Sequence, residues 1–183
     1  MSKIGRKPIL LNNVTVDIKG NLIHYKGKDI SGVYTLSNEL KAEVIDNKLL
    51  IKPAVEQKVN SRNCNRVWGM HRALLANSIQ GAGDGFEKEI QINGLGYKAV
   101  QKGNKLTFRL GYSHEKELEL PSDVTVKIDK TGQKLIFCSA DRQKLGQVCG
   151  QVKSLRKTEP YKGTGIKLAT EEIMRKDGKA KAQ

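Results

Sequence analysis

The feature that most constrains the fold of this sequence is an internal repeat. A series of short sequence motifs begins at Asn21-Leu22 and ends at Gln57-Lys58. A similar series begins at Asn104-Lys105 and ends at Gln143-Lys144, offset by 83 residues at its start and 86 at its end. Small insertions are therefore enough to align the two series. A chain that repeats itself over this length is expected to fold as two copies of one structural unit.

Both copies show the same change of hydrophobic period. In the first copy, residues 14–18 and 22–25 flank the turn sequence Lys19-Gly20-Asn21, and residues 43–45 and 49–51 flank Asp46-Asn47, which predicts two β-hairpins. A three- and four-residue spacing then predicts a helix whose apolar face is formed by Cys64, Val67, Trp68, His71, Leu75 and Ile79. We expect Asn60 or Ser61 to cap this helix, and Gly81 and Gly83 to end it.

The second copy repeats this order. Residues 97–110 and 124–137 predict two hairpins, and a helix follows with Asp141 as its cap and Pro160 as its stop. The apolar face of this helix is formed by Leu145, Val148, Cys149, Val152 and Leu155. Each copy is predicted to be an antiparallel β-sheet packed on one side by a helix, which is an α+β fold.

The glycine-rich stretch 81–85 is expected to join the two copies. The predicted organisation is a first α+β repeat with a basic N-terminal arm over residues 1–82, a second α+β repeat over 83–160, and a basic C-terminal tail over 161–183.

Positive charge is concentrated at the two ends of the chain. The formal net charge is +14, yet residues 83–150 carry eleven basic and nine acidic side chains. Residues 1–10 carry three basic side chains and no acidic one, and residues 151–183 carry nine basic and four acidic. This distribution predicts a folded body with basic arms and a polyanionic partner. A solvated basic surface without a partner is the alternative.

Several function classes are disfavoured by the sequence. No stretch approaches the roughly 20 apolar residues of a membrane span, so no membrane partner is expected. Gly94-Leu95-Gly96 lacks the third glycine of a dinucleotide site and is better explained as a strand bulge or a close backbone approach. The histidines have no metal-ligand spacing, and no GxSxG motif is present, so we expect no catalytic residue, metal ligand or cofactor. The three cysteines lack a CxxC spacing, which indicates a reducing compartment.

If the polyanionic partner is a nucleic acid, the composition also narrows how it would be recognised. Aromatic residues make up 5% of the chain, and neither an aromatic RNP-type strand nor a GXXG loop is present. Trp68 falls on the apolar helix face and is expected in the core. These features favour recognition of structured RNA through its phosphates and shape.

The C-terminal segment contains a specific motif. Glu159-Pro160-Tyr161-Lys162-Gly163-x-Gly165-Ile166 closely resembles the C-terminal signature of the large-ribosomal-subunit protein six family. Residues 1–9, 68–75, 93–99 and 175–179 also resemble that family, so the resemblance covers nearly the whole chain. The family has two duplicated α+β domains, in agreement with the repeat. Two departures are Thr158, where the family often has proline, and Thr164, where a second lysine is usual.

The resemblance implies a single-copy structural protein of the large ribosomal subunit. It implies binding to large-subunit ribosomal RNA near the sarcin–ricin stem and the translation-factor-binding region, beside neighbouring ribosomal proteins, in support of assembly and translation. No homo-oligomer is expected. The expected location is the bacterial cytoplasm, with a mitochondrial or other organellar ribosome as the alternative.

We predict the RNA-binding residues from the charge distribution together with the signature. Basic and aromatic side chains would contact phosphate or stack on a sugar, and two glycines would allow close approach. The predicted set is Lys3, Arg6, Lys7, Lys153, Arg156, Lys157, Tyr161, Lys162, Gly163, Gly165, Lys167, Arg175 and Lys176.

Two other functions remain open from the sequence. An RNA-modifying enzyme or nuclease would need acids near the basic tail, and Glu159, Glu171, Glu172 and Asp177 are the only ones available there. A general RNA chaperone would show no preference among structured RNAs.

Overall fold

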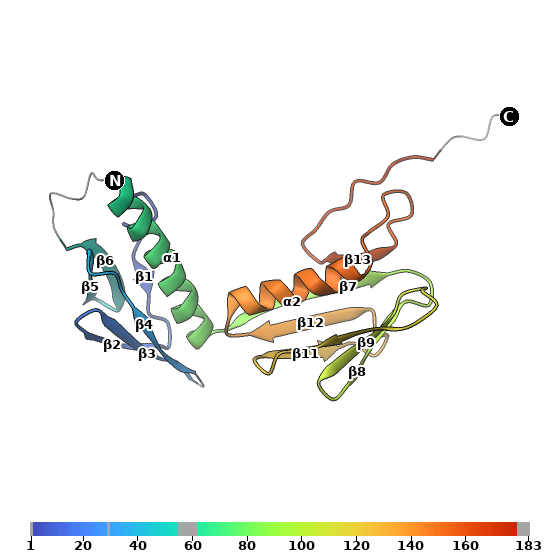
Figure 1. Cartoon of the computed structure of the whole chain (residues 1–183), viewed down its shortest axis with the longest axis horizontal. Helices are drawn as coiled ribbons and strands as arrows, with labels where there is room; N and C mark the ends of the chain where they lie inside the picture. The colour runs from blue at the N-terminus through green and yellow to red at the C-terminus, as the bar shows by residue number, and fades with distance from the viewer. Residues whose placement is uncertain (1, 29, 55–61, 179–183) are drawn as a thin grey trace. The chain divides into compact units, whose positions relative to one another are not determined.

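The computed structural model describes residues 2–28, 30–54 and 62–178, which form two compact units, Met1–Gly85 and Phe86–Gln183 (Figure 1). Each unit is α+β, as the repeat predicts. Asn60, Ser61 and the Gln57-Lys58 pair lie outside the described residues. No helix in the described ranges is long and apolar enough to cross a membrane.

The described part of the first unit contains two antiparallel three-stranded sheets and one helix. The sheet orders are β2-β3-β4 and β1-β6-β5. The elements are β1 (Ile9–Leu10), β2 (Thr15–Lys19), β3 (Leu22–Lys26), β4 (Ser31–Thr35), β5 (Leu40–Ile45), β6 (Lys48–Pro53) and α1 (Arg62–Gly83). Ile23, Leu49 and Leu75 are fully buried, so the core lies between both sheets and α1.

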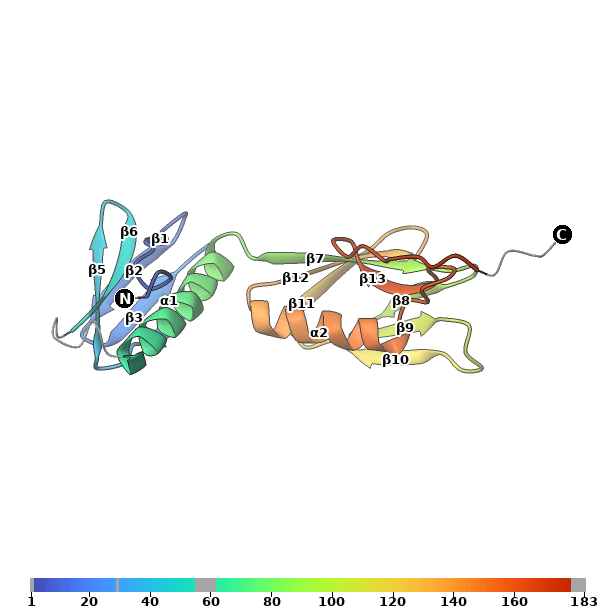
Figure 2. The same cartoon turned by 90° about the horizontal axis from the view of Figure 1, so that it is seen from above.

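The second unit repeats this arrangement and adds one strand. Its sheet orders are β10-β9-β8 and β11-β12-β7-β13. The elements are β7 (Phe86–Asn93), β8 (Lys98–Lys102), β9 (Lys105–Arg109), β10 (Lys116–Glu119), β11 (Val124–Ile128), β12 (Lys134–Ser139), α2 (Arg142–Leu155) and β13 (Gly165–Leu168). Figure 2 shows α2 running along the sheet that contains β7, β12 and β13.

Equivalent hydrogen bonds define how the two units correspond. The Leu11 N–H donates to the Asn47 carbonyl at 3.1 Å, directly after β1 and before β6. The Ile92 N–H donates to the Gln133 carbonyl at 2.8 Å, near the end of β7 and directly before β12, and Gln91 pairs with Lys134 as Leu10 pairs with Lys48. β1 therefore corresponds to β7, and β6 corresponds to β12.

Both helices place the predicted apolar positions inward. Trp68 is 5% exposed, and its indole N–H donates to the Ile51 carbonyl at 2.8 Å, so it is a core residue. The Asp141 side chain accepts hydrogen bonds from the Gln143 and Lys144 backbone N–H groups, which confirms it as the cap of α2. Gly81 lies inside α1 and does not end it.

The segment expected as a basic tail differs from that expectation. Residues 165–168 form β13, which pairs antiparallel with β7 and buries Ile166 completely. The chain after Pro160 therefore returns to the sheet of the second unit, because the alternation of Ile166 and Leu168 gives it an apolar side to bury.

Candidate nucleic-acid interface

Most of the signature motif lies in a loop that is closed by its own hydrogen bonds. We call residues 156–164, between α2 and β13, the signature loop. The Glu159 N–H donates to the Thr164 carbonyl at 2.8 Å, and the Gly163 N–H donates to the Glu159 carbonyl at 2.9 Å. The Ile166 N–H donates to the Arg156 carbonyl at 3.0 Å. These bonds fix the two ends of the loop and point the Tyr161 and Lys162 side chains outward, since both are exposed.

The two glycines of the signature are required within the chain itself. Gly165 has φ +132° and is buried, and a Cβ there would lie 2.6 Å from the Lys157 carbonyl oxygen. Gly163 has φ +70°, and a Cβ there would lie 3.1 Å from the Arg175 guanidinium. Glycine therefore allows the loop to close, and the close approach to an RNA backbone expected from the sequence stays a prediction.

Arg156 is held by aromatic rings and a carbonyl group. Its Nη1 donates to the Leu110 carbonyl at 2.8 Å. Its guanidinium carbon lies 5.2 Å from the Tyr97 ring centroid and 4.8 Å from that of Tyr112. These contacts stabilise the start of the loop and leave Arg156 half-buried, so little of it is available to a partner.

Lys153 is also engaged within the chain. Its Nζ lies 2.6 Å from Glu171 Oε1, and the two side chains are 38% and 33% exposed. The hydrogen bond from Lys153 lowers the pKa of the Glu171 carboxyl below its ordinary value near 4.5. The pair connects α2 to the chain that follows β13.

Replacing Lys153 by methionine is expected to raise the pKa of Glu171 towards its ordinary value. A carboxyl whose pKa is lowered in the folded state adds stability above its unfolded pKa, and this stability is lost as the pH falls through the folded value. The variant should therefore lose less stability than the wild type below about pH 4.5. An NMR titration of Glu171 together with thermal unfolding between pH 3 and 7 would measure both effects.

The control for this titration is Lys144→Met, because Lys144 pairs with Asp123 and not with Glu171. An unchanged Glu171 titration in Lys153→Met would show that the ion pair does not form in solution.

The chain after β13 folds back on the signature loop. The Lys176 N–H donates to the Pro160 carbonyl at 3.0 Å, and the Arg175 guanidinium lies against Gly163. We call the exposed side chains gathered there the C-terminal cationic surface. It consists of Lys157, Tyr161, Lys162, Arg175 and Lys176.

The remaining predicted residues lie elsewhere. Lys167 is half-buried in β13, opposite Gln91 of β7. Lys3, Arg6 and Lys7 belong to the first unit, in a turn whose Gly5 packs on the Trp68 indole. Lys3 and Lys7 are exposed there. The structure thus brings together four of the predicted C-terminal cations and gives Lys153 and Arg156 intrachain partners.

A second group of cations was not predicted from the sequence. Lys98, Lys127, Lys130 and Lys134 line two adjacent hollows around the turn between β11 and β12. The two hollows share Ile128 and Asp129. Lys127, Lys130 and Lys134 lie close together in a region of nearly balanced charge, and the contact between β8 and β11 brings Lys98 to them.

Two prominent side chains of α1 have structural roles. His71 Nδ1 lies 2.8 Å from the Tyr34 hydroxyl, and burial lowers the pKa of His71. Together with the buried Trp68, this arrangement offers no aromatic platform on α1 for stacking bases.

Comparison with known proteins agrees with this description. The family described as "Ribosomal protein L6" matches residues 93–168. "Large ribosomal subunit protein uL6" of Dinoroseobacter shibae is 38% identical over 99% of this chain and 100% of its own length. The proteins of the same name from Bartonella henselae and Rhodospirillum rubrum are 37% and 35% identical over the same shares.

Relatives that match over their whole length define the class of this protein as a structural ribosomal protein and not an enzyme. The chain belongs to the ribosomal protein L6 family, which confirms the family predicted from the signature.

Proposed function

We propose that this protein is a component of the large ribosomal subunit that binds ribosomal RNA, chiefly through the C-terminal cationic surface. The observation that carries this proposal is that Lys157 and Lys162 of the signature loop lie with Arg175 and Lys176 of the chain that folds back on it. All four are exposed, and none forms an ion pair with another described residue. Cations without carboxylate partners attract phosphates and release counterions when they bind them.

The form of the loop suits a structured RNA. Since its ends are held by backbone hydrogen bonds, little conformational entropy is lost when it binds. Tyr161 is 55% exposed beside Lys162 and has a ring able to stack on a base or sugar. Lys3 and Lys7 would supply a second contact from the first unit.

The finer placement rests on the family. We infer contact near the sarcin–ricin stem and the translation-factor-binding region, one copy per ribosome, and neighbouring ribosomal proteins as further partners. The similar proteins named above are bacterial, which supports a place on the cytoplasmic ribosome of a bacterium.

Cosedimentation tests this function directly. Tagged protein should appear in the large-subunit peak of a sucrose gradient, in stoichiometric amount, at moderate and at high salt. Loss from that peak at modest salt would instead indicate a general basic RNA binder. Equal affinity for unrelated structured RNAs would support that second reading.

A further inference from the structure

The duplication leaves one sheet edge covered in the second unit and open in the first. In the second unit, the outer edge of β7 pairs with β13, with Gln91 opposite Lys167 and Asn93 opposite Gly165. Among the described residues of the first unit, β1 pairs only with β6 in its sheet, β1-β6-β5. Because Leu11 corresponds to Ile92, Leu10 corresponds to Gln91. The backbone of Gln91 that faces away from β12 is paired with β13.

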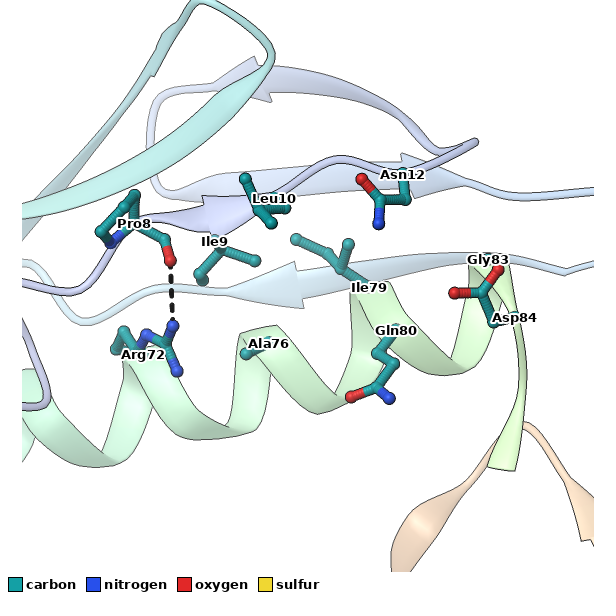
Figure 3. Close-up of a pocket in the computed structure, with 10 residues that line it drawn as sticks. All are labelled: Pro8, Ile9, Leu10, Asn12, Arg72, Ala76, Ile79, Gln80, Gly83 and Asp84. Atoms are coloured by element: carbon teal, nitrogen blue, oxygen red, sulfur yellow. Dashed lines mark hydrogen bonds between the residues drawn. The ribbon is translucent and has the colours of Figure 1, made fainter. Parts of the chain in front are cut away.

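The open edge presents backbone groups to a partner. In an antiparallel ladder successive residues point their N–H and C=O groups to opposite edges, so those of Leu10 point away from β6. Within the described ranges, no hydrogen bond reaches them. The next outward group, the Pro8 carbonyl, accepts from Arg72 Nη2 at 3.0 Å (Figure 3). In the second unit, the Glu89 carbonyl instead accepts from the Ala169 N–H at 3.0 Å, just after β13.

A groove of about 340 Å³ lies beside this edge, between β1 and α1. Figure 3 shows its lining residues, which come from β1 and its neighbours on one side and from α1 on the other. Ala76, Ile79 and Gly83 present small or apolar surfaces to it. The equivalent place beside β7 is occupied by β13, which packs on α2 and whose Ile166 is fully buried.

We propose that this groove binds an extended segment of a neighbouring protein, which adds to β1 as an antiparallel strand. Strand addition would give the Leu10 N–H and C=O the partners that Lys167 gives to Gln91. The segment would carry apolar residues at alternate positions, as β13 does with Ile166 and Leu168. This inference is independent of the RNA-binding surface on the second unit.

The direction of the segment follows from β13, and the charges around the groove indicate what lies at its end. Since β13 runs from Asn93 towards Ile90, an equivalent strand would end beside Pro8. Lys7 is exposed there, and the Arg72 guanidinium lies at the same end. In the second unit the acid that follows β13, Glu171, pairs with Lys153. We therefore expect an acidic residue just after the strand-forming part of the segment.

An extended peptide fits this groove better than RNA does. Asp84 lies at one end, and the lining between the ends is mainly apolar or uncharged. A phosphate backbone would meet cations at one end only, whereas a peptide could also pair with the open N–H and C=O groups of Leu10.

The test uses the full-length chain and a fluorescent nonapeptide with the sequence of residues 163–171, which contains β13 and Glu171. Anisotropy should show saturable binding below about 1 mM. NMR amide shifts should map to residues 9–12 and 76–83. A peptide with aspartate in place of Ile166 and Leu168 should not bind.

Two variants close the groove in different ways. Leu10→Pro removes the outward N–H and should weaken peptide binding at least tenfold, while Leu10→Ala keeps the N–H and should bind within about twofold of the wild type. Ala76→Arg fills the groove from α1 and should also weaken peptide binding. This variant tests the proposal if Leu10→Pro fails to fold. The proposal would be overturned if Ala76→Arg bound the peptide as the wild type does, or if the NMR amide shifts were confined to the second unit. It would also be overturned if an RNA hairpin, and not the peptide, shifted the amides of the groove.

Discussion

Replacing Gly165 by alanine is expected to lower the free energy of unfolding of the second unit by about 3 kcal/mol. The backbone there has φ +132°, and the new Cβ would lie 2.6 Å from the Lys157 carbonyl oxygen and 2.7 Å from Thr158 Cα. Backbone atoms held by a hydrogen-bonded loop have little room to move. The start of β13 would therefore shift and expose Ile166, which is fully buried. Urea unfolding monitored by circular dichroism would measure the loss.

The matched control is Gly103→Ala in the same unit. Gly103 has φ +62°, and a Cβ there would meet nothing within 4 Å. Its substitution should cost only the backbone strain, about 1 kcal/mol. Equal losses in the two variants would show that the close approach to Lys157 is absent in solution.

Removing the four cations of the C-terminal cationic surface is expected to cause the largest loss of RNA binding. Each phosphate contact contributes about 0.7 to 0.9 to the slope of log affinity against log salt. Alanine at Lys157, Lys162, Arg175 and Lys176 should therefore reduce that slope by about 3 and lower affinity on the order of 10²- to 10³-fold near physiological salt. Filter binding or anisotropy with large-subunit ribosomal RNA, measured from low to high salt, would give both quantities.

A control with the same change in net charge separates this surface from charge in general. Lys52, Lys105, Arg109 and Lys144 each form an ion pair with a carboxylate. Their replacement by alanine should reduce the slope far less, because each cation is already partly neutralised. If both quadruple variants lose the same affinity, the protein binds RNA through its overall charge and not through this surface.

The sequence predicted most of the elements that have a clear period, although not β7, whose Phe86, Ile90 and Ile92 alternate with polar residues. The hairpins around Gly20 and Gly103 and the apolar faces of α1 and α2 are visible as alternation and as three- and four-residue spacing. Strands with mostly polar residues were not predicted. β10 is Lys-Glu-Leu-Glu at a sheet edge, and β4 is half exposed, so neither carries enough apolar residues to show a period of two.

β13 was also missed, for a different reason. Glycine and proline around the signature indicate a break from the helix, and the lysines indicate exposure, so the segment was expected to be an arm. Its pairing with β7 joins Gly165 to Asn93, and no local pattern records a contact over that distance in sequence.

The candidate site shows the same limit at the level of side chains. The sequence locates the positive charges but not their partners. Lys153 and Arg156 look equivalent to Lys157 in the sequence, yet only Lys157 is exposed and free of an ion pair with another described residue. Which cations are available to phosphate depends on where Glu171, Leu110 and the tyrosine rings lie.

The pairing of β13 with β7 also affects how the chain folds as it is synthesised. β7 ends at Asn93 and its partner begins at Gly165, so 72 residues separate the two. At a synthesis rate of about 5 to 20 residues per second, the β7 edge stays unpaired on the nascent chain for roughly 4 to 14 seconds. An unpaired edge attracts other strands during that time. A message truncated before the codon for Gly165 would make that exposure permanent, and its product should aggregate or be degraded.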